Sequence, residues 1–120
     1  MYFDPPGPTF SGAAHLATVE VDPESGQVRV TGYAVVEDCG PVINPRLVEG
    51  QIHGAVAQGT GEALLEALAY DSGGALLTGT LMDYALPRAA DLPEPRVEHR
   101  HTPAPHVPGG VKGMGEGGTI

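Results

Sequence analysis

The sequence predicts an α+β fold: two β-hairpins and one additional strand packed on a central glycine-rich helix, followed by a C-terminal glycine-rich loop. Three observations support this prediction. Apolar and polar residues alternate on both sides of a turn sequence at residues 23–26, as they do in a hairpin. Residues 44–68 show helical spacing of apolar residues instead. Residues 103–120 follow neither period and are rich in glycine.

The first hairpin is predicted over residues 14–22 and 27–37. Its turn has proline early and glycine late, which is typical of a β-turn. A second, smaller hairpin is predicted around residues 72–74, between the segments 69–71 and 75–80. Residues 96–102 are predicted as one more strand near a sheet edge, because both faces carry charge. The apolar face of the second strand is expected to contain Val28, Val30, Ala34 and Val36.

The helix is predicted to begin at Asn44, a favourable N-cap, with Pro45 at the first helical position. Its apolar side is expected to contain Val48, Ile52, Val56, Ala63, Leu64, Leu65 and Leu68. A stripe of small residues runs beside it: Gly50, Gly54, Ala57 and Gly61. Each helical glycine costs up to ~1 kcal/mol relative to alanine. Tight packing against a sheet, or close approach of another backbone or a ligand, would offset that cost.

Composition limits the possible functions. The chain has 120 residues, at most one domain (1–120), with a formal net charge of −9, which argues against nucleic acid and anionic membranes as partners. Apolar runs are shorter than a membrane span. Cys39 is the single cysteine, so a disulfide framework is excluded, and a cytoplasmic location is expected.

One carboxylate, Glu116, stands in the glycine-rich segment 109–118. Glycines allow backbone conformations that present N–H groups to a ligand, and they leave space around the carboxylate. Glu116 is therefore a candidate general base. A flexible tail is the alternative interpretation. A phosphate-binding P-loop is not predicted, because Lys112 is followed by Gly113 rather than by serine or threonine.

The histidines and the cysteine carry weaker signals. His99 and His101 share one face of the last predicted strand, and His106 follows, but their spacing does not predict a metal site. We expect these histidines to lie on a solvated strand face. Cys39 is expected to be a buried small residue rather than a nucleophile.

Six segments, in order along the chain, resemble the molybdenum-binding subunit of the xanthine dehydrogenase and aldehyde oxidase family, in particular its carbon monoxide dehydrogenase large-subunit branch. These segments are residues 3–6, 38–45, 48–54, 57–61, 83–87 and 110–116. The resemblance spans essentially the whole chain. It corresponds to the C-terminal part of a much longer family subunit.

The resemblance implies a molybdopterin cofactor with molybdenum, which bacterial members often carry as molybdopterin cytosine dinucleotide. Glu116 corresponds to the glutamate that deprotonates a metal-bound hydroxyl in such enzymes. Gln51 corresponds to a glutamine that contacts the cofactor, and Gly50, Gly54 and Gly115 are expected beside the cofactor. Iron–sulfur clusters and FAD are expected on partner subunits.

These expectations describe part of the catalytic subunit of a molybdenum hydroxylase. The expected partners are the remainder of the molybdenum subunit, or a separate chain that supplies it, and the iron–sulfur and FAD subunits, in an oligomer. Two other interpretations stay open: a non-catalytic remnant that completes the fold of another chain, and a free-standing binding module. Alone, the chain is expected to bind no molybdenum and to be oligomeric or unstable.

Overall fold

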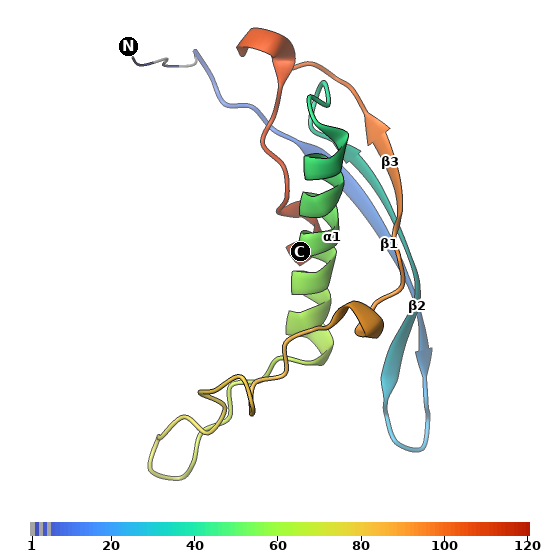
Figure 1. Ribbon diagram of the computed structural model, residues 1–120, viewed down its shortest axis with the longest axis vertical. Coiled ribbons are helices and arrows are strands. Elements are labelled where there is room, and N and C mark those ends of the chain that lie inside the picture. The colour runs from blue at the N-terminus through green and yellow to red at the C-terminus, as the bar shows by residue number, and fades with distance from the viewer. Residues whose placement is uncertain (1, 3, 5) are drawn as a thin grey trace.

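The helix lies along one face of a curved sheet in an elongated molecule (Figure 1). This computed structural model describes residues 2, 4 and 6–120, so Phe3 and Pro5 of the segment 3–6 lie outside the described residues. The molecule measures 52 × 34 × 21 Å and its radius of gyration is 18.2 Å. A compact domain of this length has a radius of gyration of about 14 Å. The elements are therefore spread out rather than closed around one centre.

The first predicted hairpin is confirmed. Strand β1 (Gly12–Val21) pairs antiparallel with β2 (Val28–Asp38). The carboxylate of Asp22 holds the turn, because it accepts hydrogen bonds from the backbone N–H of Glu24 at 3.0 Å and from the hydroxyl of Ser25 at 2.5 Å. The turn is thus specified by neighbours in sequence.

A β-bulge in β2 changes which side chains face the helix. Thr31 is the extra residue, since the register of β1 and β2 shifts there by one position. Beyond the bulge the buried side chains are Val35 and Glu37, whereas Ala34 and Val36 are only half-buried. The prediction that Ala34 and Val36 continue the inward face is therefore wrong, because one extra residue inverts the alternation of the strand.

Strand β3 (Arg96–Arg100) forms an edge of the sheet, parallel to β2 in the order β1-β2-β3. This confirms the predicted edge strand, although it ends before residue 102. Val97 and His99 are half-buried, while Glu98 is exposed. The expectation of a solvated histidine face is therefore wrong for His99, which pairs in register with the buried Glu37 of β2.

The helix α1 (Pro45–Leu64) begins as predicted, because the side-chain oxygen of Asn44 accepts a hydrogen bond from the N–H of Leu47 at 3.4 Å. It ends before residue 68. The N–H groups of Leu65 and Glu66 both donate to the carbonyl oxygen of Gly61, at 2.9 and 2.7 Å, and this turns the chain out of the helix.

The core is small. Val35 of β2 packs with Ile52 and Val56 of α1, and Met114 from the C-terminal segment is partly buried against them. The predicted apolar side of the helix is confirmed at Ile52 and Val56. The prediction is wrong for its last members, which are exposed. Leu65 and Leu68 follow the end of the helix, and an open hollow separates Ala63 and Leu64 from β1 and β2.

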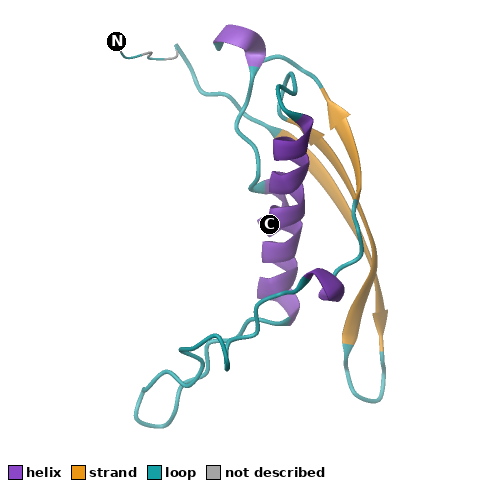
Figure 2. Ribbon diagram, in the orientation of Figure 1, coloured by secondary structure: helices purple, strands orange, loops and turns teal. Residues whose placement is uncertain are grey.

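Residues 65–88 run as a long loop away from the end of α1 (Figure 2). The second predicted hairpin lies here and forms only a turn closed by one bridge, between Tyr70 and Leu76. Asp71 organises that turn, since its carboxylate accepts from the N–H groups of Gly73 and Ala75 at 2.8 and 2.9 Å. A short 3₁₀ helix, η1 (Ala89–Asp91), then leads to β3.

The C-terminal segment returns to the helix and the sheet through two 3₁₀ turns, η2 (Pro108–Gly110) and η3 (Gly117–Thr119). A Cβ atom at Gly118 would lie 2.7 Å from backbone atoms of Ala55 and Val56. This segment is therefore packed against α1, and the alternative of a flexible tail is not supported.

The carboxylate of Asp38 joins three parts of the chain. It accepts hydrogen bonds from the N–H of Gly40 at 3.0 Å, from the N–H of Thr102 at 3.1 Å and from Nζ of Lys112 at 3.3 Å. The hydrogen bond from Thr102, followed by those from Gly40 and Lys112, holds the pKa of Asp38 well below its usual value of 3.8. Asp38 thus fixes the C-terminal segment to the end of β2.

Replacing Asp38 by asparagine keeps the size of the side chain and removes its charge. We expect a lower Tm at neutral pH and faster hydrogen exchange at the amides of Gly40 and Thr102. Because the folded pKa is depressed, the ionised carboxylate stabilises the fold above pH 3.8, and this stabilisation is lost as the pH falls through the folded pKa. The difference in Tm should therefore shrink in acid. A difference that is constant with pH would contradict this role.

Candidate functional site

Glu116 lies in a tight turn directly before η3. Thr119 holds this turn, because its N–H and its hydroxyl both donate to the carbonyl oxygen of Glu116, at 3.1 and 2.7 Å. The preceding residue, Gly115, has φ of +110°, which favours glycine. The side chain of Glu116 is exposed. The turn therefore fixes the backbone of Glu116 and presents its carboxylate outward.

Gln51 of α1 lies against this turn. A Cβ atom at Gly115 would come within 2.7 Å of Oε1 and 3.5 Å of Cβ of Gln51, so only glycine fits between the turn and the amide. The structure thus brings together three of the predicted site residues from distant parts of the sequence: Gln51, Gly115 and Glu116.

The other two predicted residues, Gly50 and Gly54, lie on an exposed side of α1. A Cβ atom at either position would have no heavy atom within 4 Å among the described residues. Later helical glycines do make close contacts. Gly59 lies directly against the carbonyl oxygen of Gly118, and Gly61 lies against Pro87. The glycine stripe therefore has two parts: one packs against this chain and the other faces outward.

Two open hollows flank Glu116. One, of about 440 Å³, is also lined by residues of β1 and β2, including His15 and Glu37. The other, of about 330 Å³, is lined by the N-terminal segment around Phe10 and by Gly113 and Met114. A larger hollow, of about 470 Å³, lies between α1 and residues 89–95 and touches none of the predicted site residues. The chemistry of the lining residues, and not the volume of the hollow, therefore identifies the candidate site.

The analysis of the sequence missed two titratable residues of this site, His15 and Glu37. Nε2 of His15 lies 3.8 Å from Oε1 of Glu37, and Nδ1 of His15 lies 3.3 Å from the hydroxyl of Tyr33. A Cβ atom at Gly117 would lie 3.2 Å from both Oε1 of Glu37 and Nε2 of His15. The pair therefore lies directly beneath the Glu116 turn. The available signal was that Tyr33, Val35 and Glu37 alternate along one face of β2.

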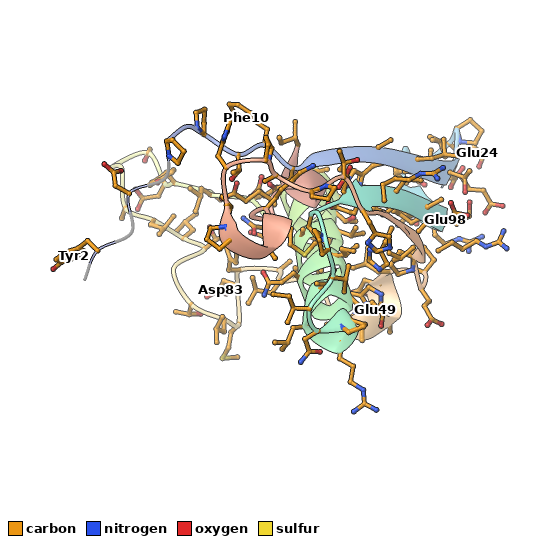
Figure 3. The ribbon with its side chains drawn as sticks, turned by 90° about the horizontal axis from the view of Figure 1, so that it is seen from above. Tyr2, Phe10, Glu24, Glu49, Asp83 and Glu98 are labelled. Carbon is orange, nitrogen blue, oxygen red and sulfur yellow. The ribbon has the colours of Figure 1, made fainter. Side chains whose placement is uncertain are left out.

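Glu37 is an unusual acid in this protein. Figure 3 shows Glu24, Glu49 and Glu98 at the periphery, on the hairpin turn, the helix and the edge strand. Glu37 is only 3% exposed. Burial raises the pKa of Glu37 above its usual value of 4.5, and the nearby His15 and His99 partly oppose this. Its carboxyl group therefore holds a proton to higher pH than an exposed glutamate does.

Other candidate chemistry is limited. Among residues 2, 4 and 6–120, no three His, Cys, Asp or Glu side chains gather as metal ligands. Cys39 is buried as predicted, and burial raises the pKa of its thiol, which disfavours the nucleophilic thiolate. Lys112 pairs with Asp38.

Within the described part of the chain, no helix is long and apolar enough to cross a membrane.

The chain is similar to known proteins in sequence and in fold. A family model described as a molybdopterin cofactor-binding domain matches residues 2–93. The matched region contains β1, β2 and α1, including Gln51, and ends before the Glu116 turn.

Individual relatives extend further along the chain. The carbon monoxide dehydrogenase large chain of Hydrogenophaga pseudoflava is 41% identical over 115 residues, which are 96% of this chain and 14% of that protein. The nicotine 6-hydroxylase large subunit of Paenarthrobacter nicotinovorans is 47% identical over 118 residues, 98% of this chain and 14% of the relative. The chain thus spans about one seventh of the length of these relatives.

A solved structure of reconstituted carbon monoxide dehydrogenase from Oligotropha carboxidovorans superposes with a TM-score of 0.92 at 34% identity, covering 99% of this chain and 15% of that one. The resemblance inferred from the sequence motifs is confirmed by these matches. The chain therefore belongs to the molybdopterin cofactor-binding domains of the xanthine dehydrogenase and aldehyde oxidase family of molybdenum oxidoreductases.

Proposed function

We propose that this chain forms part of the catalytic subunit of a molybdenum hydroxylase, where it contacts the molybdopterin cofactor and supplies Glu116 as a general base. The observation that carries this proposal is the contact between the Glu116 turn and Gln51 of α1. This contact joins an exposed carboxylate, a neutral amide and a glycine backbone at one place on the surface. All three come from segments that resemble the family.

The residues present suit a pterin cofactor with a phosphate-bearing tail. The amide of Gln51 can both donate and accept hydrogen bonds, as recognition of a pterin ring requires. At Gly50 and Gly54 a bound group can approach the helix backbone without meeting a side chain. Gly115 keeps the turn close to Gln51, since any side chain there would displace the amide. We assign cofactor contacts to Gln51, Gly50, Gly54 and Gly115 on these grounds.

When bound, the molybdenum–pterin group supplies the two-electron oxidation of the substrate. This chain contributes a proton acceptor. Glu116 is exposed and its backbone is held by Thr119, so the point from which its carboxylate extends is fixed before a substrate arrives. Such a positioned base contributes about 10²–10⁴-fold to the rate of a proton transfer.

The remaining parts of the enzyme are proposed from the relatives, whose names describe large chains and large subunits. We propose that the other subunits carry iron–sulfur clusters and FAD, that the cofactor is molybdopterin cytosine dinucleotide, and that the assembly acts in the cytoplasm.

A purely structural role, completing the fold of another chain, is the second candidate. The small core and the many exposed apolar side chains favour it, because such surfaces associate with other protein. The two candidates differ in one respect: only the catalytic role requires Glu116 to be ionisable.

Glu116→Gln keeps the size of the side chain and removes the base. In the assembled enzyme we expect turnover to fall by about 10²–10⁴-fold, while molybdenum and pterin contents stay unchanged. The matched control is Glu24→Gln, on the exposed hairpin turn, which should leave turnover unaltered. Turnover of Glu116→Gln within a few-fold of wild type would favour the structural role.

Gly115→Ala tests the contact with Gln51. The new Cβ would meet Oε1 of Gln51 at 2.7 Å in a backbone conformation that disfavours alanine, so the turn must shift. We expect lower pterin content and lower turnover in the assembled enzyme. Gly113→Ala is the control, since a Cβ there has no neighbour within 4 Å. Equal loss in both variants would show that the effect is not specific to this contact.

Gly54→Val tests the outward glycine face. A Cβ at Gly54 has no heavy atom within 4 Å among the described residues outside the helix's own backbone, so the helix should form as before and its circular dichroism should be unchanged. We expect the assembled enzyme to lose pterin, because the valine would obstruct whatever approaches α1 from outside. Full pterin content and full activity would exclude a close contact at this position.

A further inference from the structure

We propose that His15 and Glu37 form a proton relay beneath the Glu116 turn, which takes the proton that Glu116 collects and passes it to solvent. This inference rests on the proposed role of Glu116 as a base. It concerns two residues that lie on strands β1 and β2, within the region that the family model matches but outside the six motif segments.

The His15–Glu37 pair is buried, but no hydrogen bond joins the two side chains. The side chains of His15 and Glu37 are 17% and 3% exposed, and Nε2 of His15 lies 3.8 Å from Oε1 of Glu37, an ion-pair distance rather than a hydrogen bond. Nε2 of His15 is buried and has no hydrogen-bond partner among the described residues. A buried polar atom without a partner is energetically costly, and Nε2 of His15 is therefore available to accept a proton.

The pair and the base share one space. His15, Glu37 and Glu116 all line the hollow of about 440 Å³. Gly117, the residue after Glu116, packs against the pair, because a Cβ there would contact Oε1 of Glu37 and Nε2 of His15 at 3.2 Å. Water in this hollow can therefore connect the carboxylate of Glu116 with the imidazole of His15.

The proton transfer balances without any further reagent. The O–H bond of protonated Glu116 breaks and an N–H bond forms at Nε2 of His15, so Glu116 becomes a carboxylate and His15 a cation. The transfer requires the His15 tautomer that carries its proton on Nδ1, which lies 3.3 Å from the hydroxyl of Tyr33. Glu37, whose Oε1 lies 3.8 Å from Nε2, stabilises the new charge when it is ionised, and the proton then leaves from His15 to solvent through the open hollow.

Few other charges face the pair. On β2, Tyr33 contacts His15 by its ring edge, with ring centroids 5.8 Å apart. On β3, His99 pairs in register with Glu37. From the C-terminal segment, Glu116 shares the hollow, whereas Lys112 is engaged by Asp38. From α1, the residue that contacts the Glu116 turn is Gln51, which carries no charge.

The variants Glu37→Gln and His15→Gln test the relay in the assembled enzyme. Glu37→Gln should not unfold the protein, because burial disfavours the charged form of Glu37 and raises its pKa. The stabilisation that protonated Glu37 contributes is present below pH 4.5 and is lost as the pH rises through the folded pKa. We expect turnover to fall on the order of tenfold in both variants, less than for loss of a direct base. The pH profile should shift, with molybdenum and pterin contents unchanged.

An infrared titration gives a readout besides activity. The carboxyl band that disappears in Glu37→Gln is assigned to Glu37, and in His15→Gln its midpoint should move to higher pH, because the charge of His15 lowers the pKa of Glu37. Glu98→Gln and His101→Gln, at exposed positions on and beside β3, are the controls. An unmoved midpoint, or unchanged pH profiles in both relay variants, would overturn the relay.

Glu116→Gln separates this inference from the proposed function. If Glu116→Gln lowers turnover while the relay variants behave as wild type, only the relay is wrong. If Glu116→Gln retains turnover, the role of Glu116 as a base is wrong, whatever the relay variants do.

Discussion

The position of the Glu116 turn depends on the carboxylate of Asp38. This side chain stands at the end of β2 and accepts hydrogen bonds from the loop after β2, from Thr102 after β3 and from Lys112 ahead of the turn. The backbone N–H of Lys112 also donates to the carbonyl oxygen of Cys39 at 2.8 Å. Among the described residues the core cluster contains three buried side chains, so such polar contacts replace much of the order that packing gives a larger domain.

The glycines of α1 have different structural roles, as the contacts around each of them show. Each costs up to ~1 kcal/mol relative to alanine in a helix interior. At Gly59 that cost is offset by the approach of Gly118, which brings the Glu116 turn against α1. At Gly50 and Gly54 no contact within the described chain offsets it. The same sequence pattern therefore serves internal packing at one end of the helix and an external contact at the other.

What the sequence could predict was local. The Asn44–Pro45 helix start and the Asp22 turn depend on neighbours in the chain, and both were predicted from residue type alone. The buried face of β2 was assigned wrongly because the Thr31 bulge depends on pairing with β1. The contact of Gln51 with Gly115 could be anticipated only through family resemblance, since no local pattern joins residues so far apart. The burial of Glu37 needed both strands and the returning C-terminal segment.

The two glutamates that line one hollow show how environment separates chemical roles. Glu116 is exposed on a glycine turn, where its carboxylate can meet an incoming group. Glu37, beneath the turn, is desolvated, which raises its pKa and favours the acid. Carboxyl groups of unlike environment in one site are the usual arrangement for moving a proton in steps. Because Gly117 has no side chain, the turn packs closely over His15 and Glu37, and both glutamates line the same hollow.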